Sequence, residues 1–171
     1  TGCLVLNSII SGSLYKGVPQ GRITGFAGPS MAGKTFIINK ILGNAQKQGI
    51  IPVIFDTEIA VDEASAIGVG MDPAKAKYVP VQTVEETRNQ IVKFLDNVIE
   101  NGAQGKFIIS IDSLGNLASQ KEIDDIDKSK TAVDMGTRAK GLKSMMRTLT
   151  FKAAEANTTI LFSNHTYDDP A

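Results

Sequence analysis

Residues 28–35 have the sequence GPSMAGKT and constrain the fold more than any other stretch of the chain. The apolar run at residues 21–28 predicts a short buried strand, and residues 33–49 carry apolar side chains at helical spacing before a final glycine. The stretch between them matches the pattern G-x-x-x-x-G-K-[S/T] in full. This context favours a phosphate-binding loop in an α/β domain over an ordinary strand-to-helix turn.

The residues of this loop have the chemistry that a nucleotide phosphate requires. Glycines let backbone N–H groups turn inward around phosphate oxygens, and the following helix adds the positive end of its dipole. Lys34 can reach the β- and γ-phosphates, and Thr35 can ligate Mg²⁺. The predicted nucleotide-binding residues of the loop are Gly28, Pro29, Ser30, Met31, Ala32, Gly33, Lys34 and Thr35. The loop alone does not distinguish a kinase, a GTPase, an ATPase motor or a recombinase.

Further apolar runs alternate with helical patterns along the rest of the chain. Strands are predicted at residues 50–56, 106–112 and 158–164, and helices at residues 83–102 and 134–157. The first of these helices opens with Thr83 and Glu86 at the spacing of a capping box. Because the strands are continuous apolar runs, we expect one domain with a mostly parallel sheet and helices on both faces. Residues 119–134 are polar and poorly periodic, which predicts a mobile loop inside the domain.

The composition limits how the chain can meet its partners. The 171 residues carry 18 basic and 18 acidic side chains, so any contact with a polyanion must come from a local cluster. The one cysteine, Cys3, excludes an internal disulfide framework and fits a reducing cytoplasm. No apolar run is long enough to span a bilayer. We expect a cytoplasmic protein without membrane contact, and a fragment with segments missing on both sides.

Polar residues follow the predicted strands at the edge where open α/β sheets bind ligands. Asp112 ends a strand and could hold Mg²⁺ or its water shell, although a helix cap is the alternative. Asp56 and Glu58 would point the same way if their strand stays extended. A carboxylate there could activate an attacking water, but Glu58 could also be a solvated loop residue. His165, the one histidine, follows the last strand; a lone histidine is usually a structural hydrogen-bonding residue, but its position near the presumed γ-phosphate favours a functional one.

Five segments occur in the order seen in RecA-family recombinases, namely GPSMAGKT, FDTEIAVD, IDSLGNLAS, DMGTRAKGLKSMMRTL and FSNHTYD. The segments IDSLGNLAS, PVQTVEETR and NHTY most resemble the phage branch of that family, the UvsX-type recombinases. The resemblance covers nearly the whole chain and is far more specific than the phosphate loop alone. It implies a RecA-like P-loop core that uses ATP and Mg²⁺ and forms a homo-oligomeric helical filament on single-stranded DNA. The filament would pair this strand with homologous duplex DNA, with ATP between neighbouring subunits.

The resemblance also assigns roles to residues of the nucleotide site. Glu58 matches the glutamate that activates water, and Asp112 with Ser113 matches the second nucleotide motif. His165 stands where bacterial members have a glutamine that senses the γ-phosphate. Asp62 fits an aspartate that contacts adenine.

The chain departs from the family pattern at three places. Ser65 lies where bacterial members stack a tyrosine on the base, which leaves the base contacts open. Residues 119–134 match the first DNA-binding loop, but the second would begin just after His165, close to the end of the chain. The N-terminal oligomerisation segment of the family is also absent. Whether the fragment alone forms filaments or hydrolyses ATP is therefore left open.

The predicted helix at residues 134–157 carries the candidate DNA contacts. Lys140, Lys143 and Arg147 lie at positions i, i+3 and i+7, so they share one face. Met135 and Arg147 coincide with a methionine and an arginine near DNA in bacterial members, and Lys140 matches an arginine there. Lys143 is the weakest candidate. Solvation of a surface helix is the alternative role for these cations; if they bind DNA, we expect phosphate contacts and not base readout.

Four functions remain in competition. A DNA-dependent ATPase that performs strand exchange fits the ordered motifs best. A hexameric replicative helicase motor shares the core fold and the interfacial ATP. A small-molecule kinase would need a substrate lid and an acceptor site, and we find neither in the sequence. A non-catalytic nucleotide-binding regulator would bind ATP without DNA-stimulated turnover.

Overall fold

The computed structural model describes residues 1–58, 63–127 and 135–166. Within these ranges, five strands form one sheet in the order β1-β5-β4-β2-β3, and all neighbours are parallel. The strands are β1 (Ile23–Gly28), β2 (Ile51–Asp56), β3 (Lys77–Pro80), β4 (Phe107–Asp112) and β5 (Thr159–His165). The predicted α/β class with a parallel sheet is therefore confirmed.

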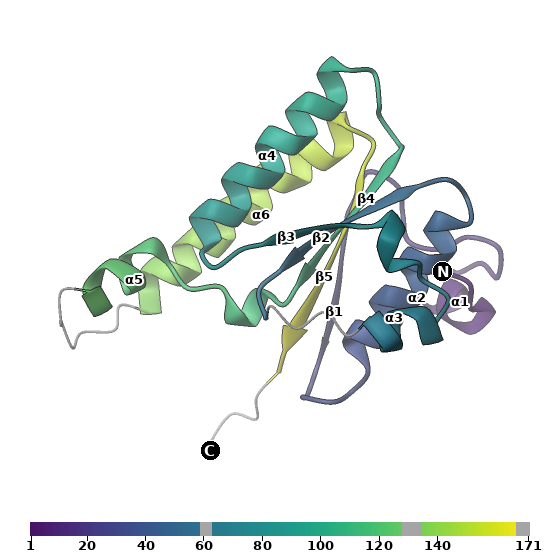
Figure 1. Cartoon of the computed structure of the whole chain (residues 1–171), viewed down its shortest axis with the longest axis horizontal. Helices are drawn as coiled ribbons and strands as arrows, with labels where there is room; N and C mark the ends of the chain where they lie inside the picture. The colour runs from purple at the N-terminus through teal and green to yellow at the C-terminus, as the bar shows by residue number, and fades with distance from the viewer. Residues whose placement is uncertain (59–62, 128–134, 167–171) are drawn as a thin grey trace.

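Helices cover both faces of this sheet, as predicted. They are α1 (Leu4–Ser11), α2 (Lys34–Gln46), α3 (Glu63–Gly68), α4 (Val84–Glu100), α5 (Gln120–Asp127) and α6 (Met135–Glu155), with short 3₁₀ turns η1 (Pro73–Lys75) and η2 (Leu114–Asn116). Helices α4 and α6 lie side by side on one face, and α2 with α1 and α3 lies on the other (Figure 1). No helix in the described ranges is long and apolar enough to cross a membrane.

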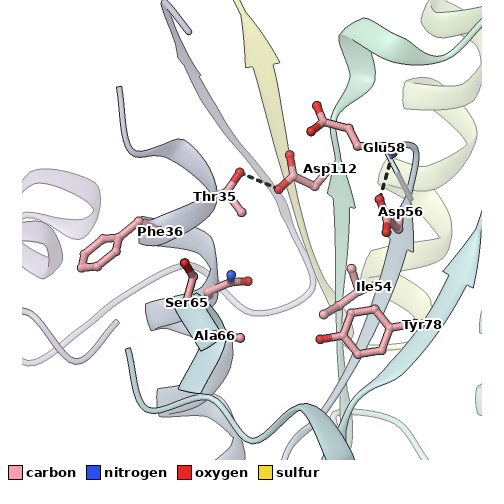
Figure 2. A pocket seen from close by; sticks show the side chains of 10 residues that line it. Thr35, Phe36, Ile54, Asp56, Glu58, Ser65, Ala66, Tyr78 and Asp112 are labelled. Atoms are coloured by element: carbon pink, nitrogen blue, oxygen red, sulfur yellow. Dashed lines mark hydrogen bonds between the residues drawn. The ribbon is translucent and has the colours of Figure 1, made fainter. Parts of the chain in front are cut away.

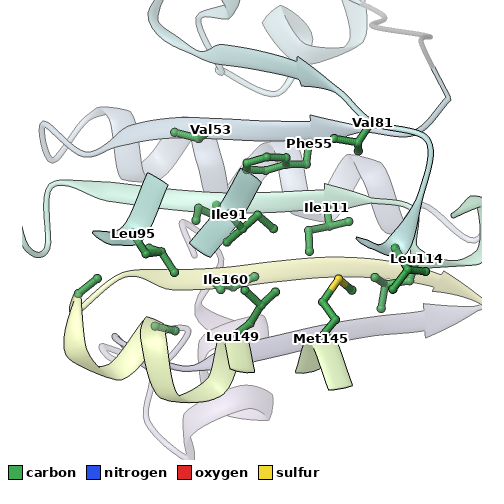
Figure 3. Close-up of a cluster of buried hydrophobic side chains, with 14 of the residues drawn as sticks. Val53, Phe55, Val81, Ile91, Leu95, Ile111, Leu114, Met145, Leu149 and Ile160 are labelled. Atoms are coloured by element: carbon green, nitrogen blue, oxygen red, sulfur yellow. The ribbon is translucent and has the colours of Figure 1, made fainter. Parts of the chain in front are cut away.

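Each face of the sheet has its own hydrophobic core. On the α4–α6 side, Leu95, Met145 and Leu149 pack with Ile160 and are fully buried (Figure 3). On the other side, α2 packs against strand residues that include Ile54. Side chains alternate between the two faces along a strand, and burial of each large aliphatic group contributes about 1.5–3 kcal/mol. The sheet is thereby held on both sides and gives the loops at its carboxyl edge a fixed base.

The predicted helices form within a few residues of their expected ends. One half of the predicted capping box forms at the start of α4. The backbone N–H of Glu86 donates to Thr83 Oγ1 over 3.1 Å, and the carboxylate of Glu86 accepts from the backbone N–H of Gln82 over 3.1 Å. The Thr83 hydroxyl thus caps one donor of the first turn, whereas the Glu86 carboxylate bonds the residue before the N-cap.

The structure corrects the prediction of a loop over residues 119–134, because Gln120–Asp127 form helix α5. A complete capping box starts it. Glu122 N–H donates to Ser119 Oγ over 3.2 Å, and Ser119 N–H donates to Glu122 Oε2 over 2.5 Å. Residues 128–134 lie outside the described residues. The sequence pattern also failed to predict α1, α3 and the short edge strand β3.

The last strand is longer at its end than predicted. The register of β5 against β1 pairs Gly28 with His165, so His165 is the last residue of the strand and does not follow it. This pairing places the histidine directly beside the start of the glycine-rich loop.

Candidate phosphate-binding site at the carboxyl edge of the sheet

The glycine-rich loop connects β1 to α2 and leaves the first turn of the helix open. Met31 and Gly33 have φ angles of 61° and 81°, which turn the chain tightly before the helix. Gly33 is the N-cap residue of α2 and supplies no side-chain cap. The first N–H groups of α2 are thus available to an anion, and the helix dipole favours negative charge there.

Lys34 lies beneath the loop and is 9% exposed. Its Nζ donates to the carbonyl oxygens of Gly28 over 3.0 Å and Pro29 over 2.7 Å. The same Nζ lies 3.4 Å from Nδ1 of His165. These contacts compensate the desolvation of the ammonium group. The two predicted residues Lys34 and His165 are therefore neighbours in space, although they lie 131 positions apart in the chain.

Asp112 at the end of β4 is held by hydroxyl groups from both sides. Thr35 Oγ1 donates to Asp112 Oδ2 over 2.8 Å (Figure 2), and Ser163 Oγ on the neighbouring strand β5 donates to Asp112 Oδ1. Asp112 does not cap η2, whose N-cap residue is Ser113. A threonine hydroxyl and a carboxylate side by side are the oxygen ligands that a hard cation prefers.

The oxygen atoms of Thr35 and Asp112 suit a Mg²⁺ ion that is also coordinated by phosphate oxygens. Among the described residues no cluster of three or more His, Cys, Asp or Glu side chains could hold a metal alone. Mg²⁺ commonly uses one or two protein ligands together with phosphate oxygens and water, so Thr35 with Asp112 suffices. The hydroxyl of Ser113 is fully buried and has no hydrogen-bond partner within the described ranges. Buried polar groups usually have a partner, so this hydroxyl is an exception at the edge of the site.

The turn after β2 positions Glu58. The backbone N–H of Glu58 donates to Asp56 Oδ1 over 2.9 Å, so the chain bends directly after the strand (Figure 2). The strand ends at Asp56, so the condition under which Asp56 and Glu58 would point the same way is not met. The exposed carboxylate of Glu58 accepts from Asn116 Nδ2 over 2.9 Å. One of its two oxygens therefore has a partner in the protein.

Two adjoining cavities of about 230 and 630 Å³ connect these groups. Their shared lining residues are Thr35, Phe36, Glu58, Ser65 and Asp112. Lys34 and His165 line the larger cavity only, and Tyr78 lines the smaller one. Burial raises the pKa of Tyr78, and the nearby carboxylates of Glu63 and Asp56 raise it further, so its phenol stays neutral at physiological pH.

The predicted site residues fall into three groups. The loop residues, Glu58, Asp112, Ser113 and His165 are brought together at one edge of the sheet. The basic side chains of Lys140, Lys143 and Arg147 are exposed on α6, which begins at Met135. Asp62 lies outside the described residues.

Sequence reasoning missed four residues that organise the site. Thr57 Oγ1 donates to the carbonyl of Asp112 over 3.0 Å and accepts from the backbone N–H of Ser113 over 2.8 Å. Ser163, Asn116 and Arg138 are the others. Of these four, only Ser163 could have been found from the sequence. It lies two residues before His165, and residues at positions i and i+2 of a strand share a face.

Comparison with known proteins adds independent findings. The family model for the RecA N-terminal domain matches residues 1–168. The chain is 34% identical over 166 residues to the recombination and repair protein of Enterobacteria phage T4, covering 96% of this chain and 41% of the relative. It is 30% identical over 165 residues to protein RecA of Bifidobacterium breve, covering 96% of this chain and 39% of the relative. The chain thus spans about two fifths of the length of these relatives.

Proposed function

Because this chain belongs to the RecA N-terminal domain family, we propose that it is the ATP-binding core of a DNA strand-exchange recombinase that acts in recombination and repair. The observation that carries the proposal is that the phosphate loop contacts the ends of the next two strands of the sheet, β5 and β4. Lys34 lies beside His165 on β5, and Thr35 is bonded to Asp112 on β4. The printed name of the phage relative, a recombination and repair protein, supports the same role.

The residues of the loop and of β4 would bind the nucleotide. Lys34 would exchange its two carbonyl contacts for phosphate oxygens, which keeps its ammonium group paired. Thr35 and Asp112 would hold Mg²⁺, which neutralises charge on the phosphates when it is bound. Ser113 would complete the same edge with its buried hydroxyl.

Glu58 and His165 would act on opposite sides of the phosphate chain. Glu58 lines both cavities and would accept a proton from the attacking water at its carboxylate. His165 would donate a hydrogen bond to the terminal phosphate, since its ring lies beside the ammonium group of Lys34. The segment that follows His165 would then respond to the state of the nucleotide.

Single-stranded DNA would bind through the exposed cations of α6, with Lys140 and Arg147 as the leading phosphate contacts. The full-length protein would assemble as a helical filament with ATP between subunits. A neutral chain needs such a local cluster to hold a polyanion.

The test is imaging of the full-length protein with single-stranded DNA and a slowly hydrolysed ATP analogue, together with an assay for joint molecules between that strand and homologous duplex. Regular filaments and ATP-dependent joint molecules are expected. Lys34→Ala should abolish ATP turnover and joint molecules, whereas Lys40→Ala on the same helix should retain both. Closed rings that unwind a fork would instead identify a helicase motor, and nucleotide binding without DNA-stimulated turnover would identify a regulator.

A further inference from the structure

The 3₁₀ turn η2 lies against both groups that the proposed function places near the terminal phosphate. From this turn, Asn116 Nδ2 donates to Glu58 Oε1 over 2.9 Å. Gly115 in the same turn lies beside the end of β5, since a Cβ there would be in ordinary contact with Asn164 Oδ1 at 3.4 Å and His165 Cδ2 at 3.6 Å. A shift of η2 would therefore move Asn116, the hydrogen-bond partner of Glu58, and would change the packing against strand β5, which carries His165.

Arg138 on α6 holds η2 in place through hydrogen bonds to its backbone carbonyls. Its Nε donates to the carbonyl of Leu117 over 2.7 Å, and its Nη2 donates to the carbonyls of Leu114, over 3.3 Å, and Gly115. The carbonyl of Leu114 also accepts from the backbone N–H of Leu117 over 3.3 Å. A planar guanidinium can serve several carbonyls at once. Arg138 is half-buried at the start of α6, two residues before the exposed Lys140.

We infer that Asn116 and Arg138 are positioning residues for hydrolysis, through which helix α6 sets the placement of the Glu58 carboxylate. The inference rests on the proposed function, because water activation is assigned to Glu58 there. Asn116 engages Oε1 and so fixes the direction in which the carboxylate can meet a water. Arg138 ties the backbone that carries Asn116 to α6, the helix proposed to contact DNA.

The geometry explains why two residues that touch no phosphate would affect the rate. A general base works only within hydrogen-bond reach of its water, and a misplacement of about 1 Å can cost about 10²-fold in rate. A glutamate that is 58 positions away in sequence from its amide partner depends on η2 to stay in place. Loss of either support would release the carboxylate without changing the nucleotide-binding loop.

The first arm of the test uses Asn116 in the full-length protein. Asn116→Ala should lower kcat by roughly tenfold and leave KM for ATP within about twofold, because only positioning is lost. Asn116→Gln keeps an amide donor and should recover part of the loss. Asn101→Ala, which removes an exposed amide at the end of α4, is the matched control and should be neutral. In a Glu58→Gln background, Asn116→Ala should cause no further loss of turnover.

The second arm uses Arg138. Arg138→Ala should lower kcat like Asn116→Ala, and the two losses should not add. Arg138→Lys should stay close to Arg138→Ala, since a point charge cannot serve three carbonyls as a planar fork does. Arg88→Ala is the control, because the guanidinium of Arg88 bonds to Asn89 on α4 and not to η2.

The outcomes separate the inference from the proposed function. Wild-type kcat in both Asn116→Ala and Arg138→Ala would overturn the inference and leave the proposed function intact. A loss in Asn116→Ala that persists at full size in the Glu58→Gln background would also overturn it, because the residue would then support the fold alone. A full-length wild-type protein with no ATP turnover would overturn both.

Discussion

Oγ1 of Thr35 donates a hydrogen bond to Oδ2 of Asp112 over 2.8 Å and so joins the first turn of α2 to the end of β4, 77 positions later in the chain. The second carboxylate oxygen accepts from Ser163 on β5. Three separate elements thus hold one carboxylate in place. A cation that arrives with a nucleotide would meet ligands whose positions are already set.

Asp112→Asn should raise the Mg²⁺ concentration needed for nucleotide binding. The amide keeps an oxygen that can accept from Thr35 but loses the negative charge that a hard cation requires. We expect at least a roughly tenfold shift in the Mg²⁺ midpoint, in line with a lost ligand contact of about 1.4 kcal/mol. Titration of Mg²⁺ with a fluorescent ATP analogue measures it. Asp96→Asn, which loses an ion pair between α4 and Lys152 of α6, is the control and should not shift the midpoint.

Glu58→Gln should retain ATP binding and slow hydrolysis by about 10²- to 10⁴-fold, the usual contribution of a general base. The glutamine side chain can still meet Asn116 but cannot take a proton from water. Single-turnover hydrolysis and equilibrium binding separate the two effects. An unchanged rate would make Glu58 a simple loop residue, and Glu100→Gln at the exposed end of α4 supplies the comparison.

His165→Ala should retain ATP binding and lose the gain in DNA affinity that ATP produces. The ring lies 3.4 Å from the ammonium group of Lys34 at the end of β5, where it can report the phosphate state to the residues that follow. The measurement is single-stranded DNA affinity with and without ATP. If the variant still gains affinity as the wild type does, His165 has a structural role only.

Lys140→Ala and Arg147→Ala should each weaken single-stranded DNA binding to a similar degree on all sequences. Each lost phosphate contact should also reduce the salt slope by about 0.7. Anisotropy titrations over a range of salt concentrations test both effects in the full-length protein. Lys93→Ala, an exposed lysine on α4, should match the wild type, as should ATP binding without DNA in every variant. Wild-type affinity and slope in both α6 variants would place the DNA elsewhere.

Gly43→Ala should destabilise the domain although alanine favours helices. A Cβ at Gly43 would lie 2.6 Å from the backbone oxygen of Gly70, so α2 and the turn after α3 would have to separate. Overpacking of this kind costs about 1–3 kcal/mol in the free energy of unfolding. Gly68→Ala is the control, since a Cβ there meets no heavy atom within 4 Å. Urea unfolding should show a lower midpoint for the first variant only.

The sequence patterns predicted the α/β class, four of the strands and three of the helices because these elements are long and apolar. They missed β3 because it has four residues and lies at the sheet edge with a proline at its end. Helix α5 was missed although Ser119 and Glu122 have capping-box spacing, since the segment is polar overall and carries only Ile123 and Ile126 at helical spacing. Local sequence patterns therefore predict the long elements whose apolar side chains pack on the sheet, and they miss short or mostly polar elements.

The candidate site divides in the same way. The phosphate loop, Asp112 and Glu58 were predicted because each lies in a motif or directly after a predicted strand. The supporting contacts from Ser163, Asn116 and Arg138 depend on which strands are neighbours, and no local pattern encodes that β5 lies between β1 and β4. Residues that act through tertiary contacts alone are therefore the ones that required the structure.

The strand order has a consequence for synthesis on the ribosome. Strand β1 pairs with β5, whose residue Ile160 lies opposite Ile23, so the first strand reaches its sheet position only after the last one has emerged. Pairings between such distant segments form slowly, because the intervening chain must first be closed into a loop. The glycine-rich loop that follows β1 is synthesised early, but the contact between Lys34 and His165 can form only after β5 has been synthesised. A nascent chain that lacks β5 is thus expected to expose apolar surface and to be a natural client of chaperones.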